Sequence, residues 1–403
     1  MTQRQGFFHD AEENILSGEG NNIFESNEPV RKDLVVRHVL EYPSLTTQWL
    51  PEIIISDGDG YSLHSLILGT RTKEQNYLMI ASVKLPSENL QWYSPRYDNQ
   101  SVGSEIKIER KINHEGEVVK ACFMPQNPSI IATKTYYSEV LIFDLTKHHS
   151  DADPSGICSP ELILKSHHND GDSLSWNPIM NGYIISALGD HTIGLWDINA
   201  MSTSAGVINV MTIFTQHTSI VNDVAWHPFC PIMYGSVADD GKLMIWDTRS
   251  NNTNQIIYAH ASEVHCLAFN PYNEFILATG SADETIAFWD LRYLNWKLYS
   301  FESYKDALLK VQWSPRHENV LAYSGIGKKL YVCDLSLLGE DQSAESAPTM
   351  SKYKYCEHTA EILEFSWNLN EPCVISSVAE DNIVQIWQIT EHDYHKQFFN
   401  AVH

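Results

Sequence analysis

The chain has 403 residues, 43% of them hydrophobic, and its 27 Lys and Arg against 51 Asp and Glu give a formal net charge of −24 at pH 7. Nucleic-acid affinity rests largely on basic side chains that neutralise phosphates, so this charge disfavours a direct nucleic-acid partner. It suits a basic protein such as a histone, although it equally fits a chain that is acidic only for solubility.

The hydrophobic content excludes global disorder. No stretch approaches the ~20 apolar residues of a membrane span, so we expect no membrane partner. The seven Cys include no CxxC pair, which disfavours a zinc ribbon or a disulfide framework and favours a reducing compartment. We therefore expect no metal and no cofactor.

The ends of the chain differ from its middle. Residues 1–22 are polar and are expected to be a mobile N-terminal segment. We predict an N-terminal helix over residues 23–40 and a short C-terminal helical extension over residues 391–403. Between them, residues 41–390 are predicted to form a β-propeller with a long insertion loop at 335–355, because structureless loops of that length are usually functional or disordered.

A repeat organises this middle part. Short β-like runs end in Trp-Asp or a related pair at intervals of 43 to 54 residues, without a helical pattern between them. Such a period is typical of propeller blades with four strands each. The runs end at Phe143, Trp196, Trp246, Trp289, Cys333 and Trp387.

Six blades follow from these runs. A seventh is predicted from three further strands at residues 63–68, 77–83 and 106–112. The run at residues 45–50 is expected to complete the last blade, so that the two ends of the chain close the ring and leave no open sheet edge. The predicted fold class is therefore all-β, a seven-bladed WD-repeat β-propeller with an N-terminal helix and a C-terminal helical extension.

Four of the units carry a matched polar set: a His, a hydroxyl, an Asp and the Trp. Such residues can form a hydrolase triad, but a set that occurs four times at matched spacing favours a buried structural network in each blade. In the fifth unit Tyr304, Tyr323, Gly327 and Cys333 replace all four members together, as a structural network predicts. We therefore expect no catalytic residue. The predicted networks are His167, Ser186, Asp190, Trp196; His217, Ser236, Asp240, Trp246; His260, Thr279, Asp283, Trp289; and His358, Ser377, Asp381, Trp387.

Longer strings go beyond the generic repeat: residues 40–51 (LEYPSLTTQWLP), 112–118 (INHEGEV), 246–253 (WDTRSNNT) and 275–283 (FILATGSAD). On these strings the chain resembles the histone-binding WD-repeat family, which contains the small subunit of chromatin assembly factor and the retinoblastoma-binding histone chaperones. The resemblance implies a nuclear, non-enzymatic histone-binding subunit of chromatin assembly and histone-modifying complexes. The implied partners are core histones and the other subunits of chromatin assembly, deacetylase, acetyltransferase or methyltransferase complexes.

The resemblance also implies a groove on the side of the propeller that holds a basic histone helix. Packing of the same apolar residues onto the blades is the alternative. The insertion loop is shorter than in the family and lacks its run of acids. Carried over by position, the groove residues are Ile23, Phe24, Val30, Leu34, Val35, Glu340, Asp341, Glu345 and Tyr353.

A second site implied by the resemblance is the face around the central channel, where the family captures a basic tail. Val119, His265 and Leu309 stand where the family has polar, acidic or aromatic contacts, so we expect weaker or differently selective tail binding. The residues assigned to this top-face site are Glu41, Glu117, Asp170, Asn222, Glu263 and Glu361.

Two tandem WDxR elements end in Arg249 and Arg292. They resemble the docking signature of substrate receptors of cullin ubiquitin ligases, which is the alternative function. They fit intrablade ion pairs equally well.

Overall fold

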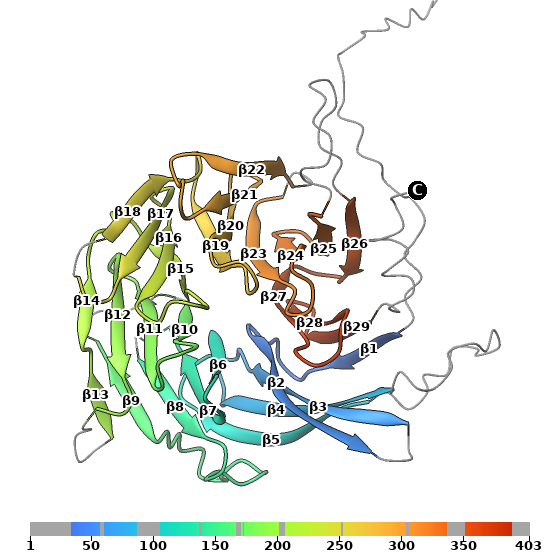
Figure 1. The fold of residues 1–403 in the computed structure, drawn as a ribbon. Helices are drawn as coiled ribbons and strands as arrows, with labels where there is room; N and C mark the ends of the chain where they lie inside the picture. Colours follow the sequence, from blue (N-terminus) through green and yellow to red (C-terminus); the bar gives the residue numbers. More distant parts are fainter. Residues whose placement is uncertain are drawn as a thin grey trace, which may run out of the picture.

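The computed structural model describes residues 34–56, 60–86, 105–136, 139–166, 171, 173–200, 206–250, 253–303, 306–336 and 351–388. These residues form seven sheets that stand radially around a common centre, and the chain passes through the sheets in order around the ring (Figure 1). The predicted seven-bladed, all-β propeller is confirmed. No helix is found among the described residues, and therefore none that could cross a membrane.

The first three blades hold strands β2 to β14. Strand β13 leaves the third blade and joins β9 of the second in parallel, which makes that sheet five-stranded. Blade 1 contains β2 (Thr47–Ser56), β3 (Tyr61–Gly69), β4 (Asn76–Pro86) and β5 (Ile106–His114). Blade 2 contains β6 (Lys120–Met124), β7 (Asn127–Lys134), β8 (Val140–Asp144), β9 (Leu162–Lys165) and β13 (Val207–Asn209). Blade 3 contains β10 (Leu174–Trp176), β11 (Tyr183–Leu188), β12 (Thr192–Asp197) and β14 (Thr212–Phe214).

The remaining four blades are regular four-stranded antiparallel sheets. Blade 4 contains β15 (Val221–Trp226), β16 (Met233–Ala238), β17 (Lys242–Asp247) and β18 (Thr253–Tyr258). Blade 5 contains β19 (Val264–Phe269), β20 (Ile276–Ser281), β21 (Thr285–Asp290) and β22 (Lys297–Glu302). Blade 6 contains β23 (Leu308–Trp313), β24 (Val320–Gly325), β25 (Lys329–Asp334) and β26 (Ser351–Glu357). Blade 7 contains β27 (Ile362–Trp367), β28 (Val374–Ala379), β29 (Ile383–Gln388) and, from the other end of the chain, β1 (Leu34–Val39).

The ring is closed by a different segment from the one predicted. Strand β1 pairs antiparallel with β29 from Leu34 opposite Gln388 to Val39 opposite Ile383 (Figure 1). The run at residues 45–50 instead falls largely in β2, the innermost strand of blade 1. Closure by the two ends of the chain is confirmed, but the prediction that residues 45–50 complete the last blade is wrong.

The predicted helix over residues 23–40 is also wrong where the structure describes it, at residues 34–39. This run contains three valines, whose branched side chains favour strands, and the edge of β29 offers it unpaired backbone groups. Val36 is buried, whereas Arg37 and Val39 are exposed. Residues 1–33 and 391–403, with the predicted N-terminal segment and C-terminal extension, lie outside the described residues.

The predicted insertion loop at 335–355 is too long at its end. Residues 351–355 belong to β26, which pairs with β25 and places Tyr353 opposite Val332. Residues 337–350 lie outside the described residues.

The core is divided between the blades. Seven clusters of buried apolar side chains each join the facing surfaces of two neighbouring sheets, so every blade is held on both sides. Burial of this kind contributes roughly 25 cal/mol per Å² of apolar surface. The arrangement explains why blades with divergent sequences keep one spacing.

Tryptophans at the ends of innermost strands add a polar tie between blades. The indole N–H of Trp226, on β15, donates to the carbonyl of Ser175 on the innermost strand of the preceding blade at 3.1 Å. Trp49 in the same way donates to Ser366 and so joins blade 1 to blade 7. Trp176, Trp313 and Trp367 make the equivalent bonds.

Candidate functional site

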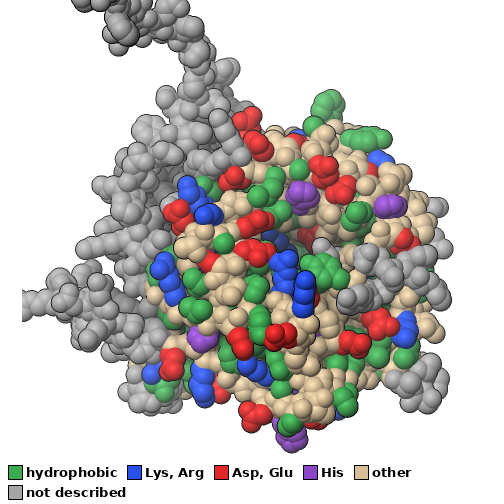
Figure 2. Space-filling view, turned by 180° about the vertical axis from the view of Figure 1, so that it is seen from behind, with side chains coloured by type: hydrophobic (Ala, Val, Ile, Leu, Met, Phe, Trp, Pro, Cys, Tyr) green, Lys and Arg blue, Asp and Glu red, His purple; other side chains and the backbone are tan. Residues whose placement is uncertain are grey.

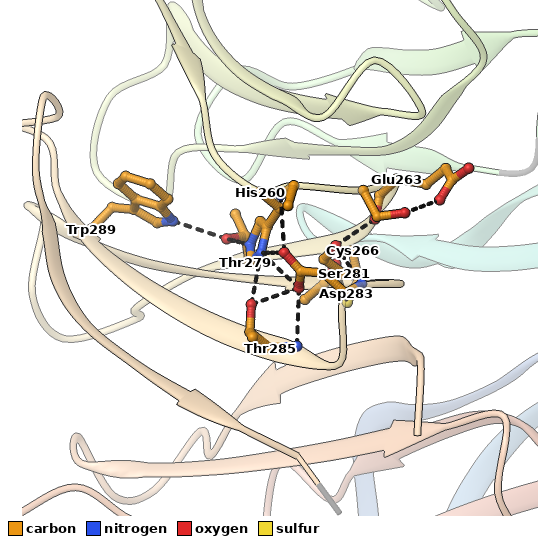
Figure 3. Close-up of polar contacts among 11 residues, drawn as sticks. His260, Glu263, Cys266, Thr279, Ser281, Asp283, Thr285 and Trp289 are labelled. Carbon is orange, nitrogen blue, oxygen red and sulfur yellow. Dashed lines mark hydrogen bonds and ion pairs between the residues drawn. The ribbon is translucent and has the colours of Figure 1, made fainter. Parts of the chain in front are cut away.

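The predicted polar networks form in blades 4, 5 and 7. In blade 5 the indole N–H of Trp289 donates to Thr279 Oγ1 at 2.9 Å, and Nε2 of His260 lies 2.8 Å from the same oxygen (Figure 3). Nδ1 of His260 lies 3.2 Å from the Asp283 carboxylate. His217, Ser236, Asp240 and Trp246 repeat this chain in blade 4, as do His358, Ser377, Asp381 and Trp387 in blade 7.

The electrostatics of these networks are structural. Burial lowers the pKa of His260 to about 4, although Asp283 opposes the shift. Burial alone would raise the pKa of Asp240, but hydrogen bonds from His217 and from the backbone of Thr218 hold it well below its usual range. The hydroxyls of Ser236 and Thr279 belong to fully buried residues. A nucleophile must reach its substrate, so these sets are not catalytic triads.

The fourth predicted network does not form as expected. Trp196 donates its indole N–H to the backbone carbonyl of Lys165 at 3.2 Å rather than to Ser186. Ser186 Oγ instead accepts a bond from the ammonium group of the fully buried Lys134 at 3.0 Å. Asp190 accepts a bond from the Thr192 hydroxyl, and His167 lies outside the described residues.

Blade 2 holds a network that sequence reasoning missed. His114 Nε2 lies 2.8 Å from Thr133 Oγ1, and the imidazole packs against Phe143 with 5.7 Å between the ring centroids. Phe143 replaces the usual Trp and cannot donate. The signal was present in the sequence, because His114 and Thr133 are 19 residues apart, the same separation as His217 and Ser236.

Both WDxR elements make intrablade ion pairs. Arg249 binds Asp247 through Nε and Nη2, and Arg292 binds Asp290 in the same bidentate way. The Arg292 guanidinium also lies 4.4 Å from the centroid of the Phe275 ring. Each Arg is therefore satisfied within its own blade.

The predicted side groove falls mostly on residues that the structure does not describe. Ile23, Phe24, Val30, Glu340, Asp341 and Glu345 lie outside the described residues. Leu34 and Tyr353 lie on strands β1 and β26, the outermost strands of neighbouring blades. Val35 packs against the apolar cluster between blades 6 and 7. Of the predicted groove contacts, this one is part of the core.

The predicted top-face residues come together at one end of the channel. Glu41, Glu117, Glu263 and Glu361 lie in loops that lead into the innermost strand of a blade. Because the strands in a blade are antiparallel, these loops all lie at the same end of the ring. Asn222 is on β15 and lines the central cavity. Asp170 lies outside the described residues.

This rim also holds a cation that sequence reasoning treated only as a replaced His. Arg71 lies 2.6 Å from Glu380 and 3.7 Å from Glu117. The pKa of Glu361 is raised by burial and by the neighbouring Glu380. The rim is therefore acidic but partly neutralised by its own arginine, and acidic, basic and apolar side chains are interspersed over the face of the molecule in Figure 2.

A buried ionic group lies below the rim and was not predicted. The Glu364 carboxylate pairs with Lys120 through one oxygen and with Lys310 through the other, at 3.2 Å for Lys310. Burial alone would raise the pKa of Glu364, but the two ammonium groups lower it. Glu364 and Asp223 raise the pKa of Lys310 against the effect of burial. All these groups line a cavity of about 310 Å³ to which residues from every blade contribute.

The fold and the repeated buried networks define the class, a WD-repeat β-propeller. Residues 208–247 and 251–290 match the model of the WD domain, G-beta repeat. A chain in the crystal structure of the mitotic checkpoint complex has a similar fold, with a TM-score of 0.63 and 14% identity over 95% of this chain and 99% of that chain.

Residues 19–87 match the model of a histone-binding family, which is described by the histone-binding protein RBBP4 and the corresponding subunit of the CAF1 complex. The chain belongs to this histone-binding WD-repeat family, which is non-catalytic. The family resemblance seen in the sequence is confirmed.

Proposed function

We propose that the chain is a non-enzymatic histone-binding subunit of chromatin assembly and histone-modifying complexes in the nucleus. The observation that carries this proposal is the match of residues 19–87 to the histone-binding family. The matched segment includes β1, β2, β3 and β4. It therefore contributes both the strand that closes the ring and most of the first blade.

The charge of the chain supports a basic partner. The net charge of −24 attracts a histone over long range and speeds the encounter. Acidic side chains at the rim, among them Glu41, Glu263 and Glu361, give this attraction a local target. We propose the side groove and the channel face as the two binding surfaces, with the residues assigned to them above.

The test is a titration of the purified full chain with core histones at low and at physiological salt. We expect micromolar or tighter binding that weakens as salt rises, because screening reduces the attraction between exposed charges. No binding at low salt would contradict the proposal.

A paired variant tests the side groove. Asp341→Lys with Glu345→Lys is expected to weaken histone binding, because it reverses two charges proposed to grip the basic helix. The matched control is Asp151→Lys with Glu318→Lys, which makes the same change of charge at two exposed positions outside both surfaces. If the two double variants bind histones equally well, the side groove is not the site.

A further inference from the structure

The central cavity of about 310 Å³ has an apolar upper wall. Leu45, Val119, Leu309 and Leu363 line it, and we call these four residues the apolar collar. Leu309 and Leu363 occupy equivalent places, because each is the extra residue of a β-bulge in the innermost strand of its blade. A bulge re-aims the side chain that it carries, and here it brings leucine to the channel from two neighbouring blades.

The charged groups below the collar are occupied by one another. Glu364 binds the ammonium groups of Lys120 and Lys310. Asp223 accepts bonds from the Ser173 hydroxyl at 2.6 Å and from the backbone N–H of Leu267 at 3.0 Å. No described carboxylate of the cavity is therefore left for a cation from outside. An arginine or lysine side chain inserted here also meets two ammonium groups, and like charges at close range cost several kcal/mol.

The rim above the collar has the opposite preference. Glu41 and Glu263 are exposed there, and Glu361 lies beside Glu380. A basic group is favoured at the rim and an apolar one in the cavity.

We infer that the channel face binds a peptide segment that inserts an apolar side chain into the collar and lays basic residues on the acidic rim. Lys120 and Lys310 are specificity-determining residues, because they take the carboxylate that a cationic side chain needs. This inference deepens the proposed function and rests on it, since it names the kind of segment that the channel face takes from a basic partner.

Two fluorescent pentapeptides test the inference in anisotropy titrations of the full chain. One has a central leucine between two arginines on each side, and the other has five arginines. We expect the leucine peptide to bind at least about tenfold more tightly. Equal binding, or a preference for the arginine peptide, overturns the inference.

Two sets of variants locate the site. Leu309→Asp with Leu363→Asp is expected to abolish binding of the leucine peptide, whereas Ile256→Asp, on the exposed outermost strand β18, is expected to leave it unchanged. Lys120→Met with Lys310→Met frees Glu364 and is expected to reverse the preference toward the arginine peptide. Circular dichroism establishes that each variant is folded. A folded lysine variant that still prefers the leucine peptide contradicts the assigned role of the lysines.

Core histones separate this inference from the proposed function. A chain that binds histones but neither peptide retains the proposed function and loses the channel inference. A chain that binds the leucine peptide but no histone retains the channel site and loses the proposed function.

Discussion

His260 Nε2 lies 2.8 Å from the hydroxyl oxygen of Thr279, and that oxygen also accepts the indole N–H of Trp289. One buried hydroxyl therefore serves two buried nitrogen groups on different segments of blade 5. Since a buried polar group without a partner costs roughly 1–3 kcal/mol, the hydroxyl stabilises more than its own bond.

Thr279→Ala tests this relationship. It leaves His260 and Trp289 without their shared partner, so the free energy of unfolding is expected to fall by about 2–4 kcal/mol. Urea unfolding measures the change. Thr279→Ser keeps the hydroxyl, which blades 4 and 7 supply from Ser236 and Ser377, and is expected to lose less than about 1 kcal/mol. Equal losses in the two variants would show that the methyl group, not the hydroxyl, matters.

The buried histidines predict acid sensitivity. Burial lowers the pKa of His64, His114 and His260 to about 4, against an ordinary value of 6.5. Between these values the unfolded chain binds more protons than the folded one, so stability falls as pH falls from about 6.5 toward 4. Each histidine contributes on the order of 3 kcal/mol to the loss at most.

Urea midpoints between neutral pH and about pH 4.5 measure this effect. His64→Gln removes one titrating group and is expected to make the dependence on pH shallower, whatever it does to stability at neutral pH. Midpoints that do not change across this range would contradict the low pKa values.

Ring closure by β1 predicts different effects for two valines of one strand. Val36 is 7% exposed and packs in the cluster between blades 7 and 1, whereas Val39 is 71% exposed. Val36→Ala is expected to cost about 2 kcal/mol, and Val39→Ala less than about 0.5 kcal/mol. Thermal and urea unfolding of the two variants measure the difference. Equal, small losses would mean that β1 contributes little to the closed ring.

The extent to which the sequence predicts this molecule depends on how local each signal is. The runs that end at Trp246 and Trp289 predicted strands β17 and β21 and the networks around them, because each lies within one repeat. Strand β1 was misassigned, because its six residues have no repeat signature and their partner β29 lies at the other end of the chain.

The channel floor escaped prediction for the same physical reason. Lys120 and Glu364 are separated by 244 residues and meet only because the ring brings β6 and β27 to one centre. In each strand the charged residue is an isolated interruption of an apolar run, which alone does not indicate its partner. The His114–Thr133 pair was local and detectable, but the search began from Trp, which blade 2 replaces with Phe143.

The ionic group around Glu364 yields the last prediction. Glu364→Gln leaves Lys120 and Lys310 facing each other in the channel without the carboxylate, and breaking a buried ion pair from one side costs about 3–5 kcal/mol. Replacing all three groups, by Lys120→Met, Glu364→Leu and Lys310→Met together, removes the charges along with their desolvation cost and is expected to retain most of the parent stability. Urea unfolding at neutral pH compares the two. High salt is expected to recover little of the loss in Glu364→Gln, because buried charges are screened far less than exposed ones. If the single variant were as stable as the parent, the carboxylate would not be what holds the two lysines in the channel.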